Sequence, residues 1–181
     1  MSRARDLLPV IGLPVLVLVV AVVGWRFVST PPSSPLVGSE APAFSLPVAA
    51  GPGAAAGQQV SLSELRGRVV LLDFWASWCA PCRQSVPILN GIHTRYVDRG
   101  VTVLGVNLER QMNRPTLASA HGALGATFPS LQDTTGEVQD LFGVAELPTL
   151  VLIDRQGVVR HVGSGVPDGE GLANRIDSLI E

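Results

Sequence analysis

The chain has 181 residues, of which 46% are hydrophobic, and this is enough to build one globular domain with an appendage. Its formal net charge at pH 7 is −2, and all 13 basic residues are arginine. The sequence contains no basic stripe, which argues against a nucleic-acid partner.

The first predicted element is a membrane-spanning helix over Leu7 to Trp25, a run of nineteen residues without a charge. Arg3 and Arg5 precede this run, and positive charges on this side favour a cytoplasmic N-terminus. A cleaved signal peptide is the alternative. The apolar run is longer than a typical signal-peptide core, Arg26 follows it directly, and no small-x-small cleavage site precedes the prolines, which favours an uncleaved anchor.

Composition divides the chain into three parts. Residues 1–28 are predicted to form a cytoplasmic tip and the transmembrane anchor, residues 29–39 a Pro/Ser-rich linker, and residues 40–181 one α/β domain. The linker cannot build a core, and about a dozen extended residues reach at most ~40 Å. The domain is therefore expected close to the extracytoplasmic (periplasmic or outer) face of the inner or cytoplasmic membrane.

A short β-hairpin is predicted at the start of the domain. Residues 43–46 and 58–62 alternate between polar and apolar side chains, as the two strands of a hairpin do. The Ala/Gly-rich stretch between them, residues 49–57, is interpreted as a loop insertion without function.

Both cysteines of the chain follow the next predicted strand, Val69 to Phe74, and precede a helix-like run from Arg83 to Arg99. A C-x-x-C pair at a strand-to-helix junction indicates a redox dithiol. Free N–H groups and the positive end of the helix dipole stabilise a thiolate at Cys79, which is predicted to be the nucleophile. Cys82 is more interior and is predicted to resolve the mixed disulfide formed at Cys79.

Three other interpretations of the cysteine pair are weaker. A zinc site needs about four ligands, and the remaining candidates are three histidines without paired spacing, so no metal and no cofactor is expected. A purely structural disulfide gains little from closing a two-residue loop. A peroxidatic cysteine would have Pro seven residues before it and Thr or Ser three residues before it. Counted from Cys79, these positions hold Leu72 and Ala76.

Beyond the dithiol, apolar runs and turn residues predict an alternation of strands and helices. The predicted elements are a buried parallel strand over Val101–Val106, a helix over Asn113–Gly122, a short strand over Phe128–Leu131, a helical turn over Glu137–Phe142, an edge strand over Val158–Val162 and a final amphipathic helix over Gly169–Ile180.

Several segments together resemble a known family. The sequence Trp-Cys-Ala-Pro-Cys at residues 78–82, Pro87 in the following helix, and Leu-Pro-Thr at 147–149 are similar to the active site, the helix proline and the cis-proline segment of the TlpA/ResA-like, membrane-anchored thiol-disulfide oxidoreductases. The resemblance implies a thioredoxin-like α/β fold: a central mixed β-sheet flanked by helices, with an N-terminal β-hairpin extension. The interval from Cys82 to Pro148 is 66 residues, longer than in a minimal thioredoxin, and the excess resembles the central insert of this family.

The resemblance also assigns residues around the dithiol. It implies that Pro148 is cis and faces the sulfurs, and that the backbone of Leu147 pairs with a substrate strand. An ordinary trans proline at the start of a strand is the alternative. Trp78 is expected to shape the substrate surface beside Cys79, with a core role as the alternative, whereas Trp75 is assigned to the core.

Two carboxylates are candidates for acid-base chemistry. Asp73 lies six residues before Cys79 in an apolar strand, where an unpaired carboxylate is costly, so its pKa is expected to be raised and it could relay protons. Asp73 could instead face solvent or cap a loop. Glu109 resembles the acidic residue that the family holds near the dithiol, and a solvated loop glutamate is the alternative. The histidines are placed on surface faces or loops without a role: His93, His121 and His161.

The sequence leads to two hypotheses about function. Ala80-Pro81 between the cysteines lacks the histidine of oxidising relatives, which favours a reductant of client disulfides. The resemblance implies apocytochrome c as a client, in cytochrome c maturation, and a membrane-embedded electron donor of the CcdA/DsbD type. The alternative is a thioredoxin-fold chaperone that binds copper or a client through the two thiols.

Overall fold

The computed structural model describes residues 34–52 and 55–181. The predicted membrane helix over Leu7 to Trp25 lies outside these residues, and so does the first part of the predicted linker. Among the residues that the structure describes, no helix combines the length and the apolar character needed to cross a membrane.

Seven strands form one mixed sheet in the order β2-β1-β5-β4-β3-β6-β7. Strands β3, β4 and β5 run parallel, and β6 lies antiparallel beside β3 at the centre of the sheet. The strands are β1 (Ser45–Ala50), β2 (Gln59–Ser61), β3 (Val69–Trp75), β4 (Val101–Asn107), β5 (Ser130–Gln132), β6 (Thr149–Ile153) and β7 (Val159–Ser164). The helices are α2 (Ala80–Tyr96), α3 (Arg114–Ala123), α4 (Glu137–Leu141) and α5 (Gly169–Ile180), with 3₁₀ turns η1 (Leu62–Leu65) and η2 (Val97–Arg99).

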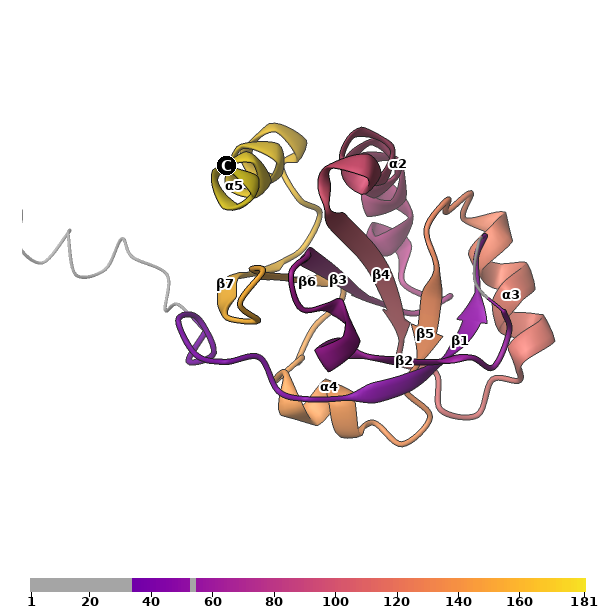
Figure 1. The fold of residues 1–181 in the computed structure, drawn as a ribbon. Coiled ribbons are helices and arrows are strands. Elements are labelled where there is room, and N and C mark those ends of the chain that lie inside the picture. The colour runs from indigo at the N-terminus through magenta and orange to yellow at the C-terminus, as the bar shows by residue number, and fades with distance from the viewer. Residues whose placement is uncertain (1–33, 53–54) are drawn as a thin grey trace, which may run out of the picture. The chain divides into compact units, whose positions relative to one another are not determined.

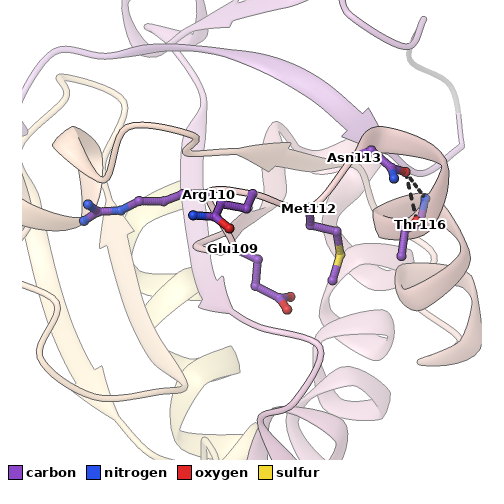
Figure 2. A pocket seen from close by; sticks show the side chains of 6 residues that line it. Glu109, Arg110, Met112, Asn113 and Thr116 are labelled. Carbon is purple, nitrogen blue, oxygen red and sulfur yellow. Dashed lines mark hydrogen bonds between the residues drawn. The ribbon is translucent and has the colours of Figure 1, made fainter.

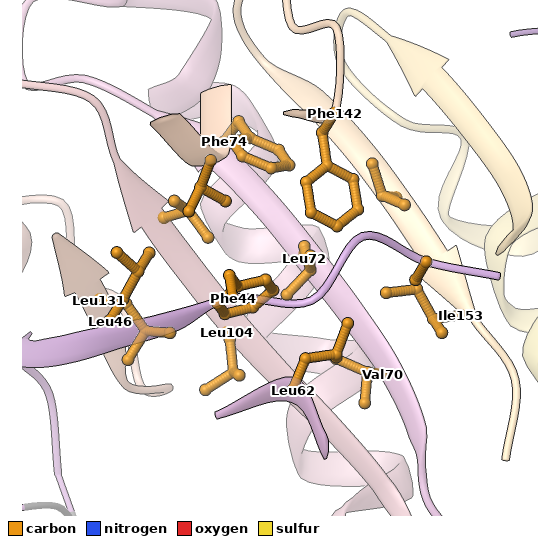
Figure 3. Close-up of a cluster of buried hydrophobic side chains, with 14 of the residues drawn as sticks. Phe44, Leu46, Leu62, Val70, Leu72, Phe74, Leu104, Leu131, Phe142 and Ile153 are labelled. Atoms are coloured by element: carbon orange, nitrogen blue, oxygen red, sulfur yellow. The ribbon is translucent and has the colours of Figure 1, made fainter. Parts of the chain in front are cut away.

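Strand β3 is buried on both faces and divides the core into two layers. Val70, Leu72 and Phe74 point to one face, where they pack with α4, η1 and the N-terminal hairpin (Figure 3). Val69 and Leu71 point to the other face, against α2 and α5, which cover that side of the sheet in Figure 1. The mixed sheet flanked by helices that the family resemblance implies is therefore confirmed.

The N-terminal hairpin is present, but its first strand is longer than predicted. β1 continues to Ala50, into the stretch 49–57 that was expected to be a loop, because Ala50 pairs with Ser130 of β5. The strand ends at Ala50, and at the next residue, Gly51, φ is +107° and an added Cβ would lie 2.5 Å from the Cα of Pro129. Only glycine fits this close approach.

The folded chain begins before residue 40. Gly38 N–H donates to Val159 O at 2.8 Å, and Val159 N–H donates to Ser39 O at 2.9 Å. Because β7 is an edge strand, this segment covers backbone groups that could otherwise pair with another chain. The last residues of the predicted linker are thus part of the sheet edge.

Helix α2 begins three residues earlier than predicted, at Ala80 instead of Arg83. Cys79 caps it, and Pro81 is tolerated because the first turn does not use its missing N–H donor. Pro87 lies inside the helix, where it removes one backbone hydrogen bond. The early start places both cysteines at the helix N-terminus.

Candidate active site

The two cysteines form a disulfide between the end of β3 and the first turn of α2. Cys79 is the N-cap residue, and its Sγ accepts a hydrogen bond from Cys82 N–H at 3.2 Å. The same N–H group and the helix dipole would stabilise a thiolate at Cys79 once the disulfide is reduced. The dithiol therefore has the local geometry that its sequence position predicts.

The two cysteines have different surroundings. Cys79 lines an outer groove of about 500 Å³ together with Trp78, Leu147 and the segment before it. Cys82 lines a narrow inner cavity together with Asp73. Exposure does not separate them, because Cys79 is 3% and Cys82 1% exposed. The difference lies in what each residue faces: the groove for Cys79 and the interior for Cys82.

The Leu147–Pro148 peptide bond is cis, as predicted. Pro148 O accepts a hydrogen bond from Gly165 N–H at 2.8 Å, and Thr149 Oγ1 donates to Glu146 O at 2.7 Å, so both sides of the bond are fixed. Leu147 makes no backbone hydrogen bond with another described residue. Its backbone is free to pair with an extended segment lying in the groove.

The two tryptophans near the dithiol have opposite environments. Trp78 is 73% exposed at the rim of the groove, which fits a surface role and excludes the core alternative. Trp75 is buried, and its Nε1–H donates to Ser130 Oγ at 2.9 Å. Gly105 makes room for this indole, since an added Cβ would lie 3.0 Å from Trp75 Nε1.

Asp73 is buried behind the dithiol, on the face of β3 that α2 covers. It is 2% exposed, and its Oδ1 has no hydrogen-bond partner among the described residues. Burial without a compensating charge raises the pKa of this carboxyl from 3.8 to about 7. The predicted direction is confirmed, and the alternatives of a solvent-facing or loop-capping carboxylate are excluded. The carboxyl can hold or release a proton near neutral pH in the cavity that Cys82 lines.

Glu109 lies beside the active-site loop and holds it by two hydrogen bonds to Ser77. Its carboxylate accepts from Ser77 N–H at 2.7 Å, from Ser77 Oγ–H at 2.8 Å and from Asn107 Nδ2–H at 3.1 Å. It lines a separate surface pocket of about 520 Å³ with Arg110 and Met112 (Figure 2). Glu109 is thus engaged with the loop that precedes Cys79, and it lines neither the groove nor the inner cavity.

Replacement of Glu109 by glutamine tests this anchoring. The amide loses the charge and presents N–H groups toward Ser77, so we expect a loss of about 1–3 kcal/mol in unfolding free energy and a several-fold lower disulfide-reductase rate. The pH profile of that rate should keep its shape. Glu170→Gln, on an exposed face of α5, is the control and should change neither quantity much. A profile that changed shape in Glu109→Gln would mean that Glu109 transfers protons.

The placement of all three histidines on the surface is wrong for His121. This residue of α3 is 3% exposed and lies on the wall of the inner cavity with Asp73 and Cys82. Its ring packs against Trp75, with centroids 5.6 Å apart, and edge-on against Phe128 at 5.9 Å. The available sequence signal was its spacing, because His121 follows Leu117 by four residues, and these two are the buried residues of α3.

No group of three or more histidine, cysteine, aspartate or glutamate side chains is placed to hold a metal ion among residues 34–52 and 55–181. The chemistry that the arrangement offers is thiol-disulfide exchange: a sulfur on a groove, a second sulfur behind it, and a buried carboxyl that titrates near neutral pH.

Comparison with known proteins agrees with this chemistry. A model of the AhpC/TSA family matches residues 37–162. The thiol-disulfide oxidoreductase ResA of Geobacillus thermodenitrificans is 32% identical over 169 residues, which cover 91% of this chain and 92% of the relative. The thioredoxin-like protein YneN of Bacillus subtilis is 29% identical over 166 residues, covering 90% and 93%.

Solved structures show the same relationship. A crystal structure from Chlorobium tepidum, described as a thiol:disulfide interchange protein DsbE, has a TM-score of 0.70 and 37% identity, covering 80% of this chain and 98% of that chain. The fold is therefore thioredoxin-like. The chain belongs to the AhpC/TSA family of thioredoxin-fold proteins and, within it, is a thiol-disulfide oxidoreductase of the ResA type.

Proposed function

We propose that this oxidoreductase is a reductant of client disulfides, tethered to the membrane with its thioredoxin-like domain on the extracytoplasmic side. The observation that supports reduction in two steps is the division between the cysteines: Cys79 lines the outer groove, whereas Cys82 lines the inner cavity with Asp73. A client disulfide approaching through the groove meets Cys79 first. The uncharged apolar run over Leu7 to Trp25 supports the tether.

The reaction begins with the reduced dithiol. The Cys79 thiolate attacks one sulfur of the client disulfide, the client's S–S bond breaks, and a mixed disulfide to Cys79 forms while the other client sulfur leaves as a thiolate. The Cys82 thiol then gives its proton to the Asp73 carboxylate. The resulting Cys82 thiolate attacks Cys79 Sγ, which releases the second client thiolate and leaves the Cys79–Cys82 disulfide seen in the structure.

Apocytochrome c is the client that we propose, within cytochrome c maturation, because its paired haem-binding cysteines must be reduced before haem is attached. A membrane-embedded donor of the CcdA/DsbD type would return two electrons to the oxidised pair. The similarity to ResA and DsbE proteins supports this assignment. The exposed Trp78 at the rim of the groove supplies a surface for a protein client.

Insulin reduction in the presence of a thiol donor tests the proposal against the copper- or client-binding alternative. We expect the protein to reduce insulin, and Cys79→Ser to lower turnover to the uncatalysed background. Equilibration with glutathione should give a reduction potential well below that of strong periplasmic oxidants. Tight Cu(I) binding without reductase turnover would support the chaperone instead, and a strongly oxidising potential would contradict the assignment as a reductant.

A further inference from the structure

The inner cavity behind Cys82 contains two polar atoms without partners. Asp73 Oδ1 from β3 and His121 Nε2 from α3 are both buried, and neither has a hydrogen-bond partner among the described residues. Both residues line the same cavity, and Cys82 from α2 lines it too. A buried polar atom without a partner costs free energy, so two on one cavity wall call for a functional explanation.

Water does not fill this role, because the cavity is too narrow to hold a water molecule. Its other walls are apolar or aromatic: Trp75, Val86, Leu124, Ala126 and Phe128. If Asp73 ionises here, the charge can be stabilised only by a donor from the cavity wall. Cys82 and His121 are the other ionisable residues on that wall.

The environment of His121 keeps it able to donate. Burial lowers the pKa of His121 to about 4, so its ring is neutral at physiological pH. A neutral imidazole carries one N–H and one bare nitrogen, and the tautomer protonated on Nε2 offers a donor inside the cavity. Trp75 and Phe128 fix the ring from two sides, with ring centroids 5.6 and 5.9 Å away.

We propose that His121 is a positioning residue for proton transfer at Cys82: its Nε2–H donates a hydrogen bond to the Asp73 carboxylate whenever this group is ionised. The inference rests on the proposed reductase function, in which the Cys82 thiol passes its proton to Asp73. While Asp73 holds its proton the carboxyl is neutral and needs no charge-stabilising donor. To accept the proton of Cys82 in the reduced protein, the carboxylate must be charged, and His121 is the cavity-wall residue that can donate a hydrogen bond to it without water.

The proton balance of this step is simple. One proton leaves Cys82 Sγ and binds a carboxylate oxygen of Asp73, and the hydrogen bond from His121 breaks as the carboxyl becomes neutral. His121 neither gains nor loses a proton. Its effect is on the protonation equilibrium of Asp73, because a hydrogen bond to the charged form lowers the pKa of a carboxyl.

The pH profile of insulin reduction by the full-length protein tests the proposal. His121→Phe removes the donor, so Asp73 should ionise at higher pH and the acidic limb of the profile should move up by about one pH unit. At pH 9 the rate should approach that of the wild type. His121→Gln keeps an Nε2–H donor at similar reach and should keep the wild-type profile.

His93→Phe is the matched control. His93 also packs against Phe128, with centroids 6.4 Å apart, but it does not line the cavity. Its substitution should leave the profile in place. If the rate of insulin reduction by His121→Phe fell equally at every pH, or if the acidic limb did not shift, the proposal for His121 would be wrong. Turnover by the wild type would still support the reductase function in either case. Infrared titration of the Asp73 carboxyl in the reduced protein measures its pKa directly. We expect a raised pKa in His121→Phe and the wild-type pKa in His121→Gln.

Discussion

Replacing Cys82 with serine should convert the protein into a trap that holds its client covalently at Cys79. The serine hydroxyl cannot attack Cys79 Sγ, so the mixed disulfide formed in the first step is no longer resolved. The outer groove should still admit the client, because Cys82 is not among the residues that line it. We expect adducts in most of the protein under oxidising conditions and insulin turnover at background.

The trapped partner identifies the client. Membranes from cells that produce Cys82→Ser would be quenched with an alkylating agent, and the adducts would be separated without reductant and identified by mass spectrometry. Cys79→Ser is the matched control, since it leaves only the sulfur that faces the inner cavity, and it should yield few adducts. Adducts in Cys79→Ser but not in Cys82→Ser would reverse the assignment of nucleophile and resolving thiol.

Most helices and strands could be predicted because the signals that define them, such as helix caps, prolines and apolar runs, act over a few neighbouring residues. The final helix has the predicted bounds, Gly169–Ile180, and begins after Asp168, whose carboxylate accepts hydrogen bonds from two N–H groups of the first turn. Pro115 lies in the first turn of α3, as expected for a residue without an N–H donor. The pairing of β1 with β5 was not predicted, because it joins strands eighty residues apart and depends on the whole sheet.

The active site also combines features that the sequence predicts with features that depend on tertiary contacts. The roles of Cys79 and Cys82 follow from a short motif, the cis Pro148 follows from the resemblance to a known family, and the burial of Asp73 follows from the apolar strand around it. The bond between Glu109 and Ser77 could not be predicted, because it requires two loops to meet at the carboxyl edge of the parallel strands.

The location of His121 shows a different limit. Its spacing from Leu117 indicates the buried face of α3, but the prediction assigned this histidine to a surface face or loop. Which wall the helix covers depends on packing between α3 and the sheet, which no local pattern records. The inner cavity is a product of that packing and so emerges only from the structure.

Asp73→Asn should make the oxidised protein more stable at alkaline pH and slower as a reductase. In the folded state the pKa of Asp73 is raised from 3.8 to about 7 by burial. Between these values the folded protein holds a proton that the unfolded chain has lost, so stability falls as pH rises through this window. This pKa shift corresponds to about 4 kcal/mol of unfolding free energy. The wild type loses this contribution by pH 8, whereas Asp73→Asn does not.

Unfolding in urea between pH 4 and pH 8 measures this difference. At pH 4 the buried amide and the protonated carboxyl are both neutral, so the two proteins should have similar stability, and the gap should open by several kcal/mol toward pH 8. Insulin reduction should be at least ten-fold slower at pH 7, because the Cys82 thiol has lost its proton acceptor.

Asp154→Asn provides a control of opposite sign. Asp154 is also buried, which by itself raises its pKa, but hydrogen bonds from Val158 and Gln156 and the Arg160 guanidinium outweigh burial and lower the pKa. Its charge therefore contributes stability at neutral pH that is lost as pH falls, and Asp154→Asn should be destabilised most at pH 7. If Asp73→Asn instead became less stable than the wild type as pH rose, the Asp73 carboxylate would be stabilised by a partner in the folded protein. Asp73 could then not be the proton acceptor for Cys82.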